Sequence, residues 1–426
     1  MSRIKISLDK KVRKIKPMHG GGQPPTTSDA SDCFFHYLTE AGIPYSRLHD
    51  VGGAFGCGKY VDIQNIFRDF NADVDDPDSY DFTFTDLLLA QLNKAKVEPY
   101  FRLGETIENA AKVKTYRLDV PSDMHKWASI CEHIVRHYTK GWANGYNYKI
   151  TYWEIWGEAD NPPYLWTGTN EEYYKLYEIT AKLIKKEHPN VKVGAYGCSS
   201  LYGAWDSKST GWEKVARTHR LPFFRGFFKY IKETDTPIDF FSYHSYYNTK
   251  KTIAHDEYIH SQLVELGYGD LEIHLNEWDP YCEEFGTAHH SAEIAAMMIA
   301  MQNSYPAVLC IYDMRTNNAP YCPLFNPITH KPIHGYYSLV AFNHLYSLGT
   351  QIESVCDTED LYVLCATDGK HNSLLISNLT GEKQELNVEG VDLSMAKFHV
   401  IDQERLLSWS PEVKTIENNA VVLIEW

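Results

Sequence analysis

The sequence predicts an α/β protein in which a (β/α)8 TIM barrel is followed by a smaller antiparallel β-sandwich. Over most of the chain, short apolar runs alternate with amphipathic segments whose apolar residues recur every three or four positions, as β/α units require. From about residue 350 the helical pattern stops, and short alternating segments separated by Gly, Asp and Asn follow. The length of 426 residues and the apolar fraction of 43% are sufficient for one large and one small domain.

Eight short apolar runs are the candidate strands of the barrel: residues 12–20, 44–50, 97–104, 149–158, 191–198, 238–246, 271–278 and 307–315. The clearest candidate helices between them are residues 32–42, 84–96, 124–142, 171–189 and 291–306. Eight β/α units are the number that closes a parallel barrel. A doubly wound open sheet is the alternative, but it needs a helix directly after its glycine-rich turn. The glycines at 20–22 are followed by Pro24 and Pro25 where that helix would begin.

The C-terminal part of the chain has the pattern of a sandwich. Its candidate strands lie within residues 361–369, 372–381, 383–390, 397–404 and 419–426. Residues 3–9 alternate in the same way, so we expect them to add a strand to this sandwich. The predicted boundaries place the barrel in residues 11–345 and the sandwich in residues 346–426, joined by the strand from residues 1–10.

Charge and cysteine content exclude several classes of protein. The formal net charge of −15 and the scattered Lys and Arg residues argue against nucleic acid as a partner. The sequence has no 18-residue apolar run and no export signal, so we expect no membrane association and a cytoplasmic location unless a signal peptide has been removed. The nine cysteines lack CxxC or Cys/His spacing, which indicates reduced thiols rather than disulfides or a zinc site.

Glu158 stands at the end of the fourth candidate strand. In a parallel barrel the active site is built at the carboxyl ends of the strands, so an acidic residue there indicates chemistry. Strict alternation would put Glu154, Trp156 and Glu158 on one face of the strand, with Glu154 deeper in the barrel. We therefore expect Glu154 to be a buried partner of an arginine or histidine, and Glu158 to reach the site.

Glu277 stands at the end of the seventh candidate strand, where alternation would place it on one face with Ile273 and Leu275. Glu158 and Glu277 would then face one cavity. Glycosidic cleavage requires two carboxyl groups beside the sugar ring, one to protonate the departing oxygen and one to capture or stabilise the anomeric carbon. The sequence thus predicts that Glu158 and Glu277 are the catalytic pair of a glycoside hydrolase.

Residues at neighbouring strand ends are candidate sugar-binding groups. Arg47 and His49 share a face of one strand, and His244 and Tyr246 share a face of another. A tyrosine near the nucleophile can donate to its carboxylate, and flat aromatic rings suit the C–H face of a sugar. The full set is Arg47, His49, Glu105, Trp166, His244, Tyr246 and Trp278. Glu105 is either a sugar ligand or an ion-pair partner of Arg47, and for the histidines and aromatic residues the alternative is ordinary core packing.

A metal-dependent hydrolase is a rival on the same fold. Such a site usually needs several converging histidines, and His19 at the end of the first candidate strand has no second histidine two residues away. We therefore expect no metal site.

Several stretches resemble glycoside hydrolase family 39, a family of retaining glycosidases that includes β-xylosidases and α-L-iduronidases. Residues 152–195 are similar to that family's acid/base segment and residues 273–280 to its nucleophile segment, and residues 47–50 and 80–104 resemble its second-strand and third-strand regions. The resemblance implies a barrel with an appended sandwich, Glu158 as general acid/base and Glu277 as nucleophile. It implies no cofactor, and it points first to β-xylosides as substrates. Because no export signal is seen, we expect the enzyme to cleave short oligosaccharides or glycosides from one end.

Gly157 departs from the family pattern, which places an asparagine at this position to contact the sugar 2-hydroxyl. Two explanations stay open: either Glu105 or Asn276 reaches that hydroxyl instead, or the vacated volume admits a sugar that is substituted or differently configured there. The departure also leaves a second class of function open: a catalytically silent carbohydrate-binding protein on a glycosidase scaffold.

Overall fold

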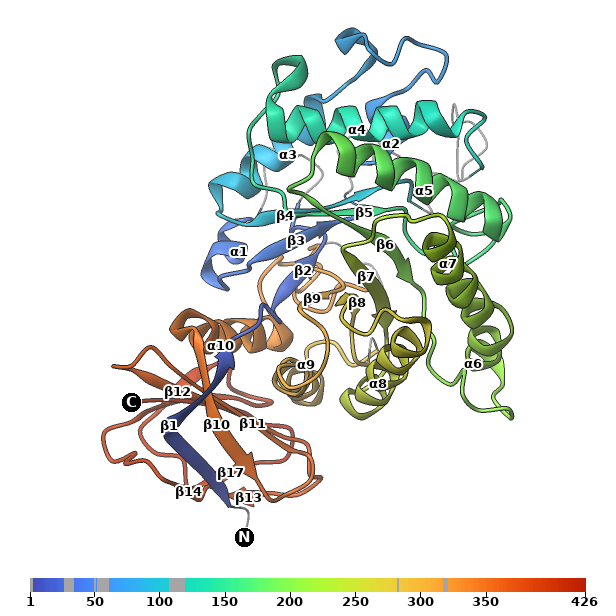
Figure 1. The fold of residues 1–426 in the computed structure, drawn as a ribbon. Helices are drawn as coiled ribbons and strands as arrows, with labels where there is room; N and C mark the ends of the chain where they lie inside the picture. The colour runs from blue at the N-terminus through green and yellow to red at the C-terminus, as the bar shows by residue number, and fades with distance from the viewer. Residues whose placement is uncertain are drawn as a thin grey trace.

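The structure, a computed structural model, describes residues 3–26, 34–49, 51, 61–106, 119–281, 283–316 and 321–426. These residues form a closed barrel of eight parallel strands and a separate, largely antiparallel sheet, which Figure 1 shows beside one edge of the barrel. The predicted fold class is therefore confirmed.

The barrel strands follow one another around the barrel in chain order. They are β2 (Gly20–Gly22), β3 (Tyr45–Leu48), β4 (Glu98–Leu103), β5 (Tyr152–Ile155), β6 (Lys192–Cys198), β7 (Phe240–Ser245), β8 (Glu272–Trp278) and β9 (Val308–Ile311). The last seven lie inside the predicted runs. The first prediction, residues 12–20, is wrong in position: residues up to Lys14 belong to the other sheet, and the barrel strand begins only at Gly20. Between them, Lys16 Nζ donates to the backbone carbonyls of Met301, Ser304 and Pro306.

Helices surround the barrel (Figure 1). They are α1 (His36–Glu40), α2 (Ile63–Ile66), α3 (Thr83–Lys94), α4 (Met124–Lys140), α5 (Asn170–Glu187), α6 (Gly211–Val215), α7 (Leu221–Glu233), α8 (Thr249–Leu266), α9 (Ala288–Met301) and α10 (His334–Leu348), with single turns at η1 (Pro77–Ser79) and η3 (Trp142–Asn144). A π-helical turn, η4 (Ala216–Arg220), joins α6 to α7. Capping side chains begin several helices, such as Asp123 at α4 and the Thr169 and Glu172 capping box at α5.

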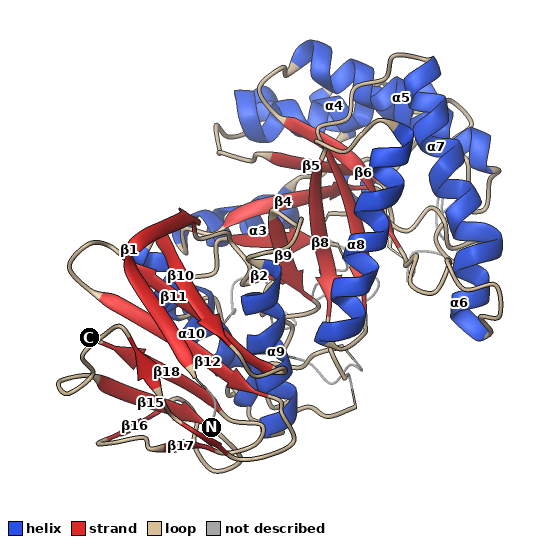
Figure 2. Cartoon of the chain, turned by 60° about the horizontal axis from the view of Figure 1, so that its bottom comes forward, coloured by secondary structure: helices blue, strands red, loops and turns tan. Residues whose placement is uncertain are grey.

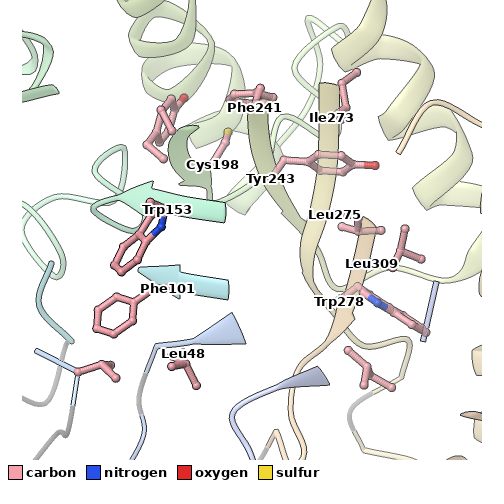
Figure 3. Close-up of a cluster of buried hydrophobic side chains, with 14 of the residues drawn as sticks. Leu48, Phe101, Trp153, Cys198, Phe241, Tyr243, Ile273, Leu275, Trp278 and Leu309 are labelled. Atoms are coloured by element: carbon pink, nitrogen blue, oxygen red, sulfur yellow. The ribbon is translucent and has the colours of Figure 1, made fainter. Parts of the chain in front are cut away.

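Alternation along the barrel strands separates two apolar layers. Tyr100, Tyr152 and Phe240 point inward and close the lower part of the barrel, the end at which the strands begin. Their neighbours Phe101, Trp153 and Phe241 point outward into the layer between the strands and the helices, as Figure 3 shows. The inward positions above the lower layer are therefore the ones left for polar side chains.

The second sheet has the strand order β14-β1-β10-β11-β12-β18-β15-β16, and β13 and β17 form a separate ribbon. Its strands are β1 (Ile4–Lys14), β10 (Thr350–Cys356), β11 (Leu361–Thr367), β12 (Asn372–Asn378), β13 (Gln384–Glu385), β14 (Val388–Glu389), β15 (Lys397–Ile401), β16 (Ser408–Ser410), β17 (Thr415–Ile416) and β18 (Val421–Glu425). The predicted N-terminal strand is present, since β1 pairs antiparallel with β10. One face of the sheet covers its own apolar cluster, and the other packs on α9 and α10 (Figure 2).

The helices and the cysteines each bear on a further prediction. None of the helices in the described ranges combines the length and the apolar character that crossing a membrane requires. The cysteines that the structure describes, from Cys131 to Cys365, are free thiols, as predicted.

Candidate active site

Glu277 reaches the barrel interior because β8 contains a bulge. The pairing of β7 with β8 matches Tyr243 with Leu275 and His244 with Glu277, so Asn276 is an extra residue. Asn276 points down the barrel and donates to Glu154 at 2.6 Å, while Glu277 turns toward the upper face. The predicted common face of Ile273, Leu275 and Glu277 is therefore wrong: Ile273 and Leu275 point outward in Figure 3.

Glu158 lies beyond the end of β5, in a turn with unusual backbone angles. Both Trp156 (φ 68°) and Glu158 (φ 48°) are left-handed, and the Glu158 amide donates to the carbonyl of Tyr196 at 2.7 Å. These angles break the alternation that would have put Glu154, Trp156 and Glu158 on one face. Trp156 instead packs against Trp166 outside the barrel.

His244 links the two catalytic candidates. Its Nδ1 donates to Glu158 Oε1 at 2.8 Å and lies 3.3 Å from Glu277 Oε2. One ligand atom from each of these three side chains lies within 4.8 Å of the other two. The two carboxyl groups that the sequence placed on different strands are thus brought into one cluster.

Glu277 is held by two further donors. Arg47 Nη1 donates to Oε1 at 2.7 Å, and the Tyr246 hydroxyl donates to Oε2 at 2.9 Å. Burial, and after it the charge of Glu277, raises the pKa of Tyr246 well above its usual value, so the phenol stays a donor. These contacts fix the orientation of the carboxylate.

A buried network supports this arrangement from below. Glu154 accepts from Arg47 Nη2 at 2.6 Å, from Ser242 and from Asn276. Burial alone would raise the pKa of Glu154, but Arg47 and the hydrogen bonds from Ser242 and Asn276 together outweigh it, and the pKa lies below its usual value. Glu154 is therefore a buried arginine partner, as predicted. The side-chain nitrogen of Asn276 is committed to this network through Glu154 and Tyr100.

The proton of the cluster is placed on the histidine. Burial would lower the pKa of His244, but Glu277 and Glu158 outweigh it, so the pKa lies above 6.5. Burial would raise the pKa of Glu158, but the hydrogen bond and charge of His244 outweigh it, so this pKa is lowered. His244 and Glu158 thus hold one proton between them, in a hydrogen bond along which it can move.

The same three side chains could offer ligand atoms to a metal ion. However, His244 Nδ1 already donates to Glu158, and the raised pKa of His244 favours a proton at that nitrogen. Metal binding would require that proton to leave, so the arrangement suits proton transfer better.

His49 and Glu105 lie near the cluster in different ways. A Cβ atom placed on Gly157 would be 3.4 Å from His49 Nε2, so the imidazole borders the position of the family asparagine. Glu105 accepts from the backbone amide of Gln64 at 3.0 Å, whereas Arg47 bonds to Glu154 and Glu277. The predicted ion pair of Glu105 with Arg47 is therefore wrong.

Trp166 and Trp278 do not offer ring faces at the site. Trp166 is 1% exposed, donates from Nε1 to the carbonyl of Thr169, and packs against Trp156. Trp278 is fully buried and points into the outer layer in Figure 3. Their prediction as sugar-binding residues is corrected: Trp278 follows Glu277 and so takes the opposite face, and Trp166 is packed outside the barrel after the left-handed turn.

Sequence reasoning missed several supporting residues. Ser242 and Asn161 both bond to site carboxylates, Ser242 to Glu154 and Asn161 to Glu158 at 3.1 Å. Ser242 could have been found, because alternation along its strand places it on the face of His244. Asn161 lies in an irregular loop, where no periodic signal exists.

A family model described as glycosyl hydrolases family 39 matches residues 3–299. A curated β-xylosidase of Geobacillus stearothermophilus is 24% identical over 278 residues, covering 63% of this chain and 47% of that protein. One of Caldicellulosiruptor saccharolyticus is 26% identical over 174 residues, covering 39% of this chain and 31% of that protein. The chain thus spans about half or less of the length of these relatives.

Solved structures share the fold. A glucosidase from Croceicoccus marinus has a TM-score of 0.79 at 18% identity, covering 100% of this chain and 98% of that one. A family 39 β-xylosidase from Caulobacter crescentus has a TM-score of 0.72 at 17% identity, covering 99% of each chain.

Proposed function

The chain belongs to glycosyl hydrolases family 39, and on that premise we propose that it is a retaining glycosidase with Glu158 as acid/base and Glu277 as nucleophile. The observation that carries the proposal is the closeness of the two carboxyl groups, each with an oxygen in a cluster whose atoms lie within 4.8 Å of one another. Retention by double displacement needs a separation of about 5 Å, whereas inversion needs roughly 6.5 to 9.5 Å to admit a water molecule. The spacing therefore supports retention.

Each step balances with the groups present. Glu277 attacks the anomeric carbon while the glycosidic bond breaks, and the departing oxygen takes a proton from Glu158. Water then attacks the covalent glycosyl-enzyme, Glu158 takes its proton, and Glu277 leaves as a carboxylate. Arg47 and Tyr246 orient Glu277 for both displacements, because each donates to one of its oxygens.

His244 holds the proton that acid catalysis uses. In the resting protein Glu158 is ionised and His244 carries the proton, so protonation of the leaving group begins with transfer along the 2.8 Å hydrogen bond. This makes His244 a partner in acid catalysis rather than only a sugar ligand. His49, Glu105 and Tyr246 are the remaining sugar-binding candidates, and His49 and Tyr246 border the same region.

The substrate is a glycoside, and β-xylosides are the first candidates. The enzyme removes a sugar from one end of a short oligosaccharide. The names of the curated relatives support this choice. Gly157 leaves room beside His49, and the side-chain nitrogen of Asn276 already donates to Glu154 and Tyr100, so it is not free to donate to a sugar hydroxyl. We therefore favour a sugar that is substituted or differently configured at its 2-position over a replacement contact from Asn276.

A panel of nitrophenyl glycosides that differ in sugar and anomeric configuration tests the proposal, with Glu277→Gln as the inactive control. We expect hydrolysis of at least one glycoside, and proton NMR should show that the first product keeps the anomeric configuration of the substrate. An inverted first product would contradict the mechanism. Tight binding of sugars without turnover of any glycoside would favour the silent carbohydrate-binding protein instead.

A further inference from the structure

Arg220 is a buried arginine without a hydrogen-bond partner in the part of the chain that the structure describes. The residue is 4% exposed, and its Nε is buried and unpartnered. A guanidinium carries five N–H donors and a permanent charge, and arginines are rarely buried unless paired. A buried donor group left in this state calls for an acceptor that the protein itself does not supply.

One face of the guanidinium is covered by an exposed tryptophan. The central carbon of Arg220, at the end of η4, lies 5.1 Å from the ring centroid of Trp212, which is 65% exposed. This contact is a cation–π interaction and holds the guanidinium plane in position. It provides no acceptor for the N–H groups at the edge of that plane.

Arg220 borders the acid/base side of the active site. Its charge acts on Asp160, Tyr247 and His255, which come from three different segments. Asp160 follows Glu158 by two residues and bonds to Ser199, directly after β6. Because the acid/base must reach the departing oxygen, the segment beside it is where the leaving group lies.

The nearby acidic and basic side chains leave the charge of Arg220 unpaired. Asp160 forms no ion pair with it: the Asp160 oxygens accept from Ser199 and Cys198, and burial raises the Asp160 pKa. Burial, and then Arg220, lowers the pKa of His255 to about 3, so His255 is neutral. Glu213 acts on Tyr247 but forms no ion pair with Arg220 among the described contacts.

A second cation and further aromatic rings adjoin this position. The rings of Tyr202 and Tyr247 lie 4.2 Å apart, and Lys251 Nζ lies 5.6 Å from the ring centroid of Tyr247. Aromatic faces suit the C–H surface of a sugar ring, and a guanidinium matches a carboxylate with two parallel hydrogen bonds.

Resting on the proposed function, we propose that Arg220 binds the carboxylate of an acidic sugar in the leaving-group part of the site. The ring of that sugar lies toward Trp212 and Tyr247, and the carboxylate completes the donor set of Arg220. The protein then prefers a uronic acid residue next to the bond that it cleaves.

Calorimetric titration at constant ionic strength tests the subsite, with sodium D-glucuronate and D-glucose as a charged and a neutral probe. We expect glucuronate to bind at least about tenfold more tightly than glucose. Arg220→Met should weaken glucuronate about 10- to 100-fold, the range expected for hydrogen bonds to a charged group, and leave glucose unchanged. The Glu213→Gln variant should bind glucuronate at least as tightly as the wild type, because it removes a negative charge from the region.

The matched control is Arg217→Met, which removes the same charge from the same turn. Arg217 donates to the carbonyl of Asp206, and its loss should leave glucuronate affinity unchanged. Equal binding of the two sugars, no binding of glucuronate, or equal effects of the two arginine variants would overturn the proposal. Circular dichroism verifies that each variant is folded.

The titration needs no turnover, so it separates the two proposals. The Glu277→Gln protein should bind glucuronate normally. A wild-type protein that cleaves no glycoside but binds glucuronate through Arg220 would refute only the proposed function. An active glycosidase that is indifferent to Arg220→Met would refute only the subsite.

Discussion

At the scale of single residues, Glu158 and Glu277 differ in the donors that hold them. Glu277 accepts from Arg47, a permanent cation, and from Tyr246, a phenol that stays protonated, whereas Glu158 accepts from the titratable His244. A nucleophile must stay ionised and an acid/base must exchange a proton. The assignment of roles therefore follows from the partners as well as from the family.

The two roles predict different responses to the leaving group. Glu158→Ala should lower kcat/KM about 10²- to 10⁴-fold on glycosides with poor leaving groups and far less on dinitrophenyl glycosides, which depart without protonation. Glu277→Ala should abolish hydrolysis of both. Steady-state kinetics on a series of aryl glycosides measures this, and equal losses for both variants on the dinitrophenyl substrate would reverse or remove the assignment.

The shared proton predicts a pH dependence. Because the pKa of His244 is raised from 6.5, the pair of His244 and Glu158 keeps one proton above that pH. When kcat/KM is plotted against pH, its fall on the basic side should therefore lie above pH 6.5. In His244→Gln only Glu158 remains to hold the proton, and the basic limb should move to lower pH. An unchanged basic limb in this variant would show that His244 does not hold the catalytic proton.

Gly157 predicts a change in sugar preference. A Cβ at this position meets His49 at an ordinary contact distance of 3.4 Å, so Gly157→Asn should fold. The asparagine adds a donor but fills the space, so activity on simple β-xylosides should rise and activity on the best substrate should fall. Kinetics of both proteins on the two substrates decides this, and full activity of the variant on the best substrate would refute the volume explanation.

At the scale of elements, regular strands were predictable and irregular ones were not. Alternation correctly placed Arg47 on β3 and His244 on β7, because both strands keep their period of two up to those residues. It failed on β8, where Asn276 is inserted as a bulge, and after β5, where Trp156 and Glu158 are left-handed. Glu277 was assigned to the right cavity only because the bulge moved it there.

The corrected placement of Trp166 predicts an effect on stability rather than on substrate binding. Trp166→Ala removes a buried ring beside Trp156 and should lower the free energy of unfolding by about 3–5 kcal/mol. KM on the best glycoside should change little at a temperature where the variant is folded. Urea unfolding combined with kinetics tests this, and a raised KM with unchanged stability would restore a sugar-binding role.

At the scale of the whole molecule, the barrel and the second sheet share an apolar layer. Residues on the helix-facing side of the sheet, such as Leu375 and Leu423, belong to the same buried cluster as Ile294 of α9 and Phe342 of α10. The sequence predicted both parts, because each has its own period, but not their contact. Contacts between distant segments leave no periodic signal in either one.

This shared layer predicts that the two parts unfold together. Calorimetry of the full chain should give one transition, and Leu375→Ala should lower its midpoint without splitting it. The surface variant Lys370→Ala is a suitable control. Two separate transitions, with only one shifted by Leu375→Ala, would show that the sheet is an independent unit.

The central claim is that this chain cleaves glycosides through a covalent bond to Glu277. The most direct measurement uses a 2-deoxy-2-fluoro derivative of the aryl glycoside that the enzyme cleaves fastest, followed by mass spectrometry of its peptic peptides. We predict one adduct of the fluorosugar mass on the peptide that contains Glu277, and inactivation that follows its formation. Inactivation with the label on another residue, or turnover of the parent glycoside without any trapped adduct and with an inverted product, would contradict the account.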